Sequence, residues 1–201
     1  IPAWHWRVDR KLGGCGMAMD SGAHWVDTMR YWFGDVESVY ARVEQFEKRP
    51  HRKGTRLVPD TREDFWTSIF NFKSGVIGTW SWTISAPGRD FTQLSMTGTK
   101  GSITANDIFH PAASGPIGEA SLSDGTSFTM AKLQQMFLED ISSREQNRLF
   151  PHGLTDGMAI ELWDFVDAIA KGRNVEIDAE EGLKSKAISE AMILNLTEKH
   201  N

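Results

Sequence analysis

Hydrophobic and polar residues alternate most regularly over residues 64–72 and 76–85, and this alternation predicts an antiparallel β-hairpin. A turn at residues 73–75 ends in glycine and joins the two strands. The large apolar side chains fall on one side of the hairpin: Trp66, Phe70, Phe72, Val76, Trp80, Trp82 and Ile84. Mostly Thr and Ser lie on the opposite side of the second strand, so the pattern predicts a sheet with one apolar and one hydroxyl-rich face.

Helical spacing of apolar residues predicts three helices, over residues 17–33, about 156–171 and about 179–200. Gly34 follows the first helix at a typical C-cap position, and Gly172 follows the second. Thr155 or Asp156 is the expected N-cap of the second helix. Gly22 interrupts the first helix at a cost in helix propensity, and we expect a close backbone approach there to explain it.

Further β structure is predicted on both sides of the central hairpin. Strand-type alternation covers residues 36–47, and a second hairpin is expected over 91–105 with its turn at 98–101. Residues 108–130, rich in Gly, Pro, Ala and Ser, predict short irregular strands. The order of one helix, many strands and two helices favours an α+β fold, with the helices packed on one face of an antiparallel sheet. We expect one domain over residues 1–201.

Composition narrows the class of protein and of partner. The chain has 201 residues, 40% of them hydrophobic, and a formal net charge of -5. Such a charge gives no reason to expect nucleic acid or an anionic membrane as a partner. The densest basic stretch, residues 48–53, is interpreted as a solvated turn. A single cysteine suits a reducing compartment, and no apolar run reaches the roughly 20 residues that span a bilayer, so we expect a cytoplasmic protein.

Aromatic content is unusual, because eight tryptophans occur in the chain. Trp80 and Trp82 lie mid-strand, which favours the core or a subunit interface over a sugar-stacking surface. Together with Trp66 and Phe70 they offer more apolar area than one layer of helices is expected to cover. The sequence therefore predicts a homo-oligomer formed through the sheet.

The candidate chemistry is concentrated in the first predicted helix. Asp20 and His24 are four residues apart, so both side chains share one helical face, and Asp27 extends that face. A carboxylate one turn from an imidazole favours the imidazolium and fixes the orientation of the ring. Such a pair suits proton transfer to or from a substrate hydroxyl, although a surface ion pair has the same spacing. No second His or Glu stands nearby at metal-ligand spacing, so no metal is expected.

A glycine-rich segment precedes this helix. Gly14 and Gly16 suggest a dinucleotide-binding loop, but Met19 occupies the place of the third glycine and no strand is predicted before the segment. We therefore expect a loop that lets the backbone approach another part of the chain closely. No cofactor-binding residue is assigned.

The order of these motifs resembles the glucose–fructose oxidoreductase/inositol dehydrogenase family. The resemblance starts with W-R-x-D at residues 6–9 and continues through the glycines at 13–16 and D-x-G-x-H-x-x-D at 20–27. It extends through the strand pair, the turn at 98–102 and the final segment GRNVEIDAEEGLKSKAISEAM. The chain departs from the family at Cys15, which replaces the usual middle glycine, and in lacking the segment that carries the family's other catalytic lysine.

This resemblance implies the fold and the roles of the site residues. It implies the family's second domain, with an open and mostly antiparallel sheet, and no Rossmann domain in this chain. His24 would exchange the proton at the substrate carbon, with Asp20 beside it orienting the ring and the substrate. Asp27, Arg7 and Trp6 would bind the substrate, a sugar, cyclitol or related polyol.

The resemblance also implies a cofactor and a missing partner domain. A complete enzyme would use NAD or NADP, while no cofactor is expected for this chain alone. A dinucleotide-binding region is expected upstream of Ile1. Two alternatives remain open, namely an NAD-dependent glycoside hydrolase of the same family and a stand-alone, non-catalytic binding or assembly domain.

Overall fold

The computed structural model describes residues 1–14, 16–85, 88, 92–105 and 118–198. Its contacts divide the chain into two compact units: unit 1 is Ile1–Pro87 with Glu176–Asn201, and unit 2 is Gly88–Val175. All paired strands in the described residues are antiparallel, apart from one isolated parallel bridge between Ala3 and Arg52. The fold class is therefore α+β with open antiparallel sheets, as predicted.

A three-stranded sheet in the order β1-β4-β5 forms the frame of unit 1. Its strands are β1 (Val36–Glu44), β4 (Phe65–Phe72) and β5 (Ile77–Thr83). Trp66 pairs with Val43 on one side and with Trp82 on the other, so the apolar side chains of all three strands meet on one face. This confirms the hairpin predicted from the alternating pattern.

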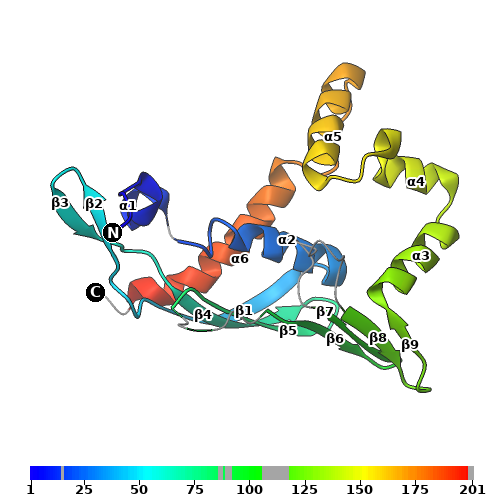
Figure 1. Ribbon diagram of the computed structural model, residues 1–201, viewed down its shortest axis with the longest axis horizontal. Helices are drawn as coiled ribbons and strands as arrows, with labels where there is room; N and C mark the ends of the chain where they lie inside the picture. The colour runs from blue at the N-terminus through cyan, green and yellow to red at the C-terminus, as the bar shows by residue number, and fades with distance from the viewer. Residues whose placement is uncertain (15, 86–87, 89–91, 106–117, 199–201) are drawn as a thin grey trace. The chain divides into compact units, whose positions relative to one another are not determined.

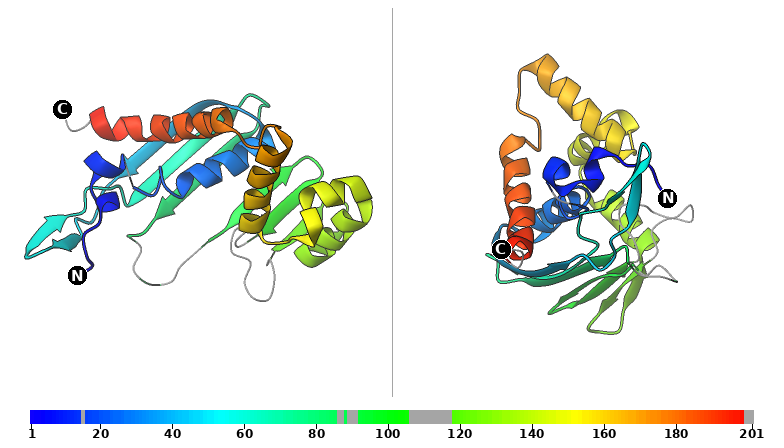
Figure 2. Two further views of the ribbon diagram at one scale, coloured as in Figure 1. Left: turned by 90° about the horizontal axis from the view of Figure 1, so that it is seen from above. Right: turned by 90° about the vertical axis from the view of Figure 1, so that its left-hand side faces the viewer.

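Two helices cover that apolar face: α2 (Gly22–Phe33) and α6 (Ala179–Glu198). Figure 1 shows both helices along one side of the sheet, and Figure 2 shows the same layering from two other directions. Trp66 is 1% exposed and stacks on Trp82 with 4.4 Å between ring centroids. Trp80 and Trp82 are partly buried and pack against this core, so the hairpin tryptophans contribute to the interior of unit 1.

Helix α2 begins five residues later than the sequence predicts. Residues 17–21 form turns instead, because the backbone N–H groups of Gly16 and Ala18 donate to the buried carboxylate of Glu63. Gly22 is the close approach that was expected, since a Cβ there would stand 3.2 Å from the Trp80 ring. Gly34 ends the helix as predicted, with φ of 85° and its N–H donated to the Arg30 carbonyl.

Four short elements lie at one end of this sheet: η1 (Trp6–Val8) and α1 (Arg10–Gly13) from the N-terminus, and β2 (Pro50–Lys53) and β3 (Arg56–Pro59) from the segment between β1 and β4. The interpretation of residues 48–53 as a solvated turn was therefore wrong. They enter the β2-β3 hairpin, because Gly54 with φ of 61° allows a tight connection. His51 is 6% exposed, so one residue of this basic stretch is buried.

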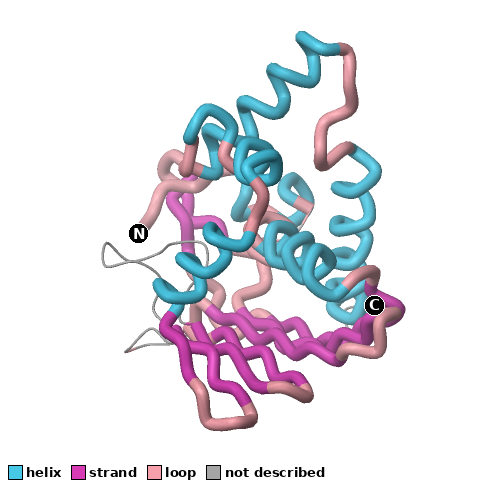
Figure 3. Tube along the Cα trace, turned by 90° about the vertical axis from the view of Figure 1, so that its right-hand side faces the viewer, coloured by secondary structure: helices cyan, strands magenta, loops and turns pink. Residues whose placement is uncertain are grey.

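Unit 2 contains a four-stranded sheet followed by helices. Its elements are β6 (Leu94–Gly98), β7 (Gly101–Ala105), β8 (Gly118–Leu122), β9 (Ser127–Thr129), α3 (Met130–Asp140), α4 (Ser143–Leu149), η2 (Pro151–Gly153) and α5 (Gly157–Lys171). Figure 3 draws the strands in magenta. The predicted turn between Gly98 and Gly101 and the Asp156 cap of α5 are confirmed. Part of the predicted 91–105 hairpin and of the 108–130 segment falls outside the described residues.

No helix among the described residues combines the length and the apolar character that a membrane crossing requires.

Candidate functional site

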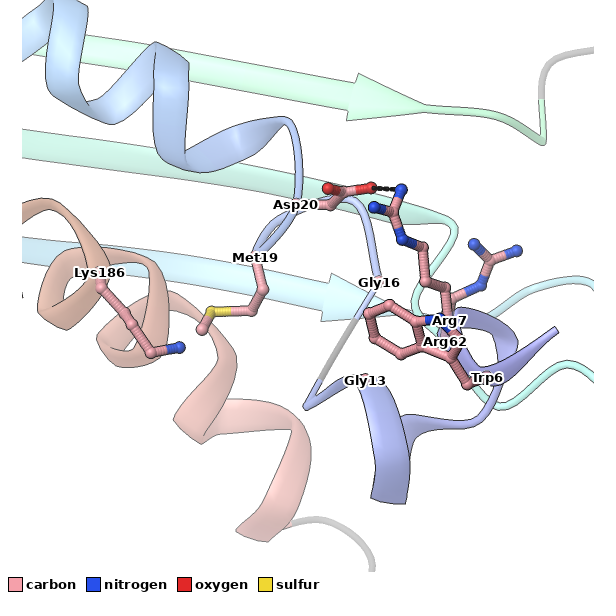
Figure 4. A pocket seen from close by; sticks show the side chains of 8 residues that line it. All are labelled: Trp6, Arg7, Gly13, Gly16, Met19, Asp20, Arg62 and Lys186. Carbon is pink, nitrogen blue, oxygen red and sulfur yellow. Dashed lines mark hydrogen bonds and ion pairs between the residues drawn. The ribbon is translucent and has the colours of Figure 1, made fainter. Parts of the chain in front are cut away.

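A cavity of about 200 Å³ opens in unit 1 between the N-terminal elements, the turn before α2 and the side of α6. Figure 4 shows its lining. We call it the pocket, and its eight lining residues are Trp6, Arg7, Gly13, Gly16, Met19, Asp20, Arg62 and Lys186. Three of the five site residues expected from the sequence, Trp6, Arg7 and Asp20, therefore meet at one place.

An exposed ion pair lies at the mouth of the pocket. Arg7 NH1 donates to Asp20 Oδ2 over 3.3 Å, and both side chains are about half exposed. The Arg7 guanidinium also lies 5.4 Å from the centroid of the Trp6 ring, which is itself 54% exposed. An aromatic face beside a cation and a carboxylate can stack on the C–H face of a sugar and hydrogen-bond its hydroxyl groups.

His24 lies on α2, outside the lining of the pocket, and its side chain is exposed. Its backbone carbonyl accepts a 2.9 Å hydrogen bond from Thr28, whereas its ring has no hydrogen-bond partner among the described residues. The expected Asp20–His24 pair on one helical face is not formed. Asp20 precedes the helix, and its carboxylate contacts Arg7 instead.

Asp27 belongs to a network that joins α2 to α6 and that sequence reasoning missed. Its carboxylate accepts a 3.0 Å hydrogen bond from Ser185 on α6. At the centre is Arg30, whose side chain is 7% exposed and donates to Glu181 at 2.8 Å and to Ser185 at 2.9 Å. Burial opposes the charge of Arg30, but hydrogen bonds to Glu181 and Asp35 outweigh it and raise its pKa.

The glycine-rich segment is occupied by a carboxylate of the chain itself. Glu63 is 1% exposed and accepts backbone hydrogen bonds from Gly16 at 2.7 Å and Ala18 at 2.9 Å. A Cβ on Gly16 would lie 2.8 Å from the Arg62 Cβ, so the glycine is required by a close approach, as expected. The N–H groups of Gly16 and Ala18, which could otherwise bind an anion such as a phosphate, therefore already have an acceptor within the chain.

A second buried carboxylate positions Arg62 at the pocket. Asp60 is 6% exposed and accepts hydrogen bonds from Arg62 Nε at 2.9 Å and NH2 at 2.6 Å. The His51 ring lies 3.2 Å from the same carboxylate. Burial alone would raise the pKa of Asp60, but the hydrogen bonds from Arg62 outweigh burial and lower it.

Among the described residues, no three His, Cys, Asp or Glu side chains are placed to hold one metal ion.

Comparison with known families identifies the chain. Residues 1–104 match the family model described as the GFO/IDH/MocA C-terminal domain. The chain belongs to the GFO/IDH/MocA family. This confirms the resemblance seen in the motifs around residues 6–27, all of which lie within the matched half. No curated protein sequence matches the chain significantly.

Solved structures of the family share the fold. The apo form of levoglucosan dehydrogenase aligns over 98% of this chain and 53% of its own, with a TM-score of 0.71 and 22% identity. The same enzyme in complex with NADH and levoglucosan aligns with a TM-score of 0.67 and 23% identity. This alignment covers 98% of the present chain and 52% of the enzyme's chain. Aldose-aldose oxidoreductase from Caulobacter crescentus, complexed with glycerol, aligns with a TM-score of 0.69 and 20% identity. This alignment covers 97% of the present chain and 49% of the oxidoreductase chain.

These likenesses establish the fold and one fact about length. The GFO/IDH/MocA chain described here spans about half the length of the solved structures that it matches. The other half of each relative has no counterpart in this sequence.

Proposed function

We propose that residues 1–201 form the substrate-binding domain of an NAD(P)-dependent oxidoreductase that acts on a sugar, cyclitol or related polyol. The observation that carries this proposal is the pocket, which gathers Trp6, Arg7 and Asp20 in a chain of the GFO/IDH/MocA family. The relatives solved with NADH and levoglucosan and with glycerol support the cofactor and the substrate class.

Substrate binding would use the three exposed groups at the mouth of the pocket. The Trp6 ring offers an apolar face to the C–H groups of a polyol, and the Arg7–Asp20 pair offers donors and acceptors to its hydroxyls. Because this ion pair is long and solvent-exposed, exchanging it for contacts with a ligand costs little. Asp20 would thereby orient the substrate hydroxyl that reacts.

Proton transfer is assigned to His24 in this proposal. Its ring is exposed and uncommitted to hydrogen bonds within the described residues, and an imidazole exchanges protons near neutral pH. Asp27 would contribute chiefly by fixing α2 through Ser185 and Arg30, and 35% of its side chain is exposed. When a carbinol is oxidised, its O–H proton would pass to the His24 ring.

The nicotinamide cofactor would be held elsewhere. The N–H groups of the glycine-rich segment already have an acceptor in Glu63, so we infer a dinucleotide-binding domain in the half of the relatives that this sequence lacks. A cofactor bound there supplies the hydride acceptor, while this chain binds the polyol and moves the proton.

Assembly and location belong to the same proposal. Because the hairpin tryptophans pack against the core of unit 1, self-association through the sheet would use the opposite face, where Tyr40, Ile69 and Ile77 are 69%, 48% and 71% exposed. The single cysteine in the sequence supports a reducing, cytoplasmic setting.

The test uses the complete reading frame that contains this sequence. We expect its product to bind NAD or NADP and to reduce it when inositols, aldoses or anhydrosugars are supplied, as followed by the absorbance of the reduced nicotinamide. Release of free aglycone from a glycoside without net change in the cofactor would instead identify the hydrolase. An upstream stop codon within a few codons, or no turnover with any polyol, would contradict the proposal.

A further inference from the structure

Three cationic side chains line the pocket of a chain whose formal net charge is -5. They are Arg7, Arg62 and Lys186, and each lies beside a carboxylate, namely Asp20, Asp60 and Glu190 respectively. Figure 4 shows the two arginines on the same side of the pocket as Asp20, and Lys186 reaching in from α6 beside Met19. Two of these cations are guanidinium groups that keep N–H donors without a partner among the described residues.

Arg62 is held in place before any ligand arrives. Its Nε and NH2 donate to the buried Asp60, and its side chain is only 18% exposed. NH1 has no hydrogen-bond partner among the described residues, so its donors remain available. A guanidinium already fixed by a carboxylate loses little side-chain entropy when it binds a ligand.

Arg7 and Lys186 take part only in weak, exposed ion pairs. Arg7 makes one 3.3 Å hydrogen bond, through NH1, to Asp20, and its other N–H groups have no partner in the part of the chain that the structure describes. Lys186 pairs with Glu190 over 3.4 Å on the exposed surface of α6. Exposed pairs of this kind contribute little, so both cations can turn toward a ligand.

From this arrangement we propose that the pocket binds an anionic group of the substrate, a carboxylate or a phosphate carried by the polyol. The inference rests on the proposed function and narrows its substrate class to polyol acids or polyol phosphates. Arg7 and Arg62 would hold the anionic group, because guanidinium groups match the geometry of carboxylate and phosphate oxygens. The exposed Trp6 ring would contact the carbon skeleton of the same ligand.

The experiment compares matched ligands on the product of the complete reading frame that contains this sequence. The indole N–H of Trp6, assigned in NMR spectra with a Trp6→Phe variant, reports binding of D-glucuronate, D-glucose 6-phosphate and D-glucose at equal ionic strength. We expect at least one anionic ligand to bind about 10-fold more tightly than glucose, the effect of one charge-assisted hydrogen bond. The two anions show whether carboxylate or phosphate is preferred.

Single substitutions show which arginines produce the preference for the anionic ligand. Arg7→Gln, an exposed change that leaves the core untouched, is expected to remove most of the preference for the anion, and Arg62→Gln is expected to do the same if it folds. Arg42→Gln is the matched control, because Arg42 is an exposed arginine on β1 that pairs with Glu44. Its ligand preference is expected to stay unchanged.

Several results would overturn the inference. These are equal or tighter binding of glucose, no saturable shift of the Trp6 signal with either anion, or equal losses in Arg7→Gln and Arg42→Gln. Tighter binding of NAD at Trp6 than of both anionic sugars would assign the cations to the cofactor and would also overturn it. The proposed function fails separately, when the complete enzyme reduces no nicotinamide with any polyol, charged or neutral.

Discussion

Two carboxylates near the glycine-rich segment differ sharply in their surroundings. Glu63 is 1% exposed and accepts short backbone hydrogen bonds from Gly16 and Ala18. The Asp20 side chain is 51% exposed and accepts one 3.3 Å hydrogen bond, from Arg7. Removing the Glu63 carboxylate leaves buried backbone N–H donors without an acceptor. Removing the Asp20 carboxylate leaves an exposed Arg7 side chain, which water can hydrogen-bond instead. The first carboxylate therefore holds the fold, and the second is available for a ligand.

The largest effect on stability is expected at Glu63. Glu63→Ala leaves the N–H groups of Gly16 and Ala18 without their acceptor, and each unsatisfied buried donor costs about 1–3 kcal/mol. We expect the free energy of unfolding, measured by urea denaturation, to fall by about 2–5 kcal/mol. Asp20→Ala is the matched control and should cost less than about 1 kcal/mol. Equal losses of unfolding free energy in the two variants would contradict the distinction between a carboxylate that holds the fold and one that is available for a ligand.

Substitutions at two separate glycines extend this comparison to the backbone. Gly16→Ala puts a methyl group 2.8 Å from the Arg62 Cβ and from Glu63, and we expect a loss of about 1–3 kcal/mol from overpacking. Gly182→Ala, within α6, meets nothing within 4 Å and should gain up to about 1 kcal/mol from helix propensity. Thermal unfolding of both variants checks the opposite signs. A neutral Gly16→Ala would show that the segment is not held tightly.

A smaller effect is expected from pH. The folded pKa of Asp60 lies below its ordinary value of 3.8, so the ionised carboxylate stabilises the folded state at neutral pH. This stability is present above the unfolded pKa and is lost as the pH falls through the lower folded pKa. In Asp60→Asn, the free energy of unfolding should therefore fall less steeply as the pH is lowered below about 4. An unchanged dependence on pH in this variant would contradict the role of the Arg62 hydrogen bonds.

Local patterns in the sequence predicted much of this fold. Alternation around Trp66 and Trp82 predicted the β4-β5 hairpin and its apolar face, and Gly34 and Asp156 marked helix ends correctly. These signals work because they depend on neighbours in the chain. The extra turns before α2 could not be read in this way, since they depend on Glu63, which is more than 40 residues away.

The candidate site was predictable only in part. The motif residues Trp6, Arg7 and Asp20 could be named from the sequence, but the expected partner of Asp20 was a residue one helical turn away. Arg62 and Lys186 carried no local signal, because they reach the pocket through the β3-β4 connection and through α6. Arg30 was not singled out by the sequence, because its partners Glu181 and Ser185 lie on α6, far away along the chain.

The most direct test of the central claim is the turnover of the complete enzyme with His24 replaced. His24→Gln keeps the length and polarity of the side chain and, on this exposed position, should leave folding and dinucleotide affinity unchanged. We predict that turnover at saturating cofactor and polyol falls by about 100-fold or more, the usual contribution of a positioned general acid or base. Turnover close to that of the unmodified enzyme would contradict the assignment of proton transfer to His24.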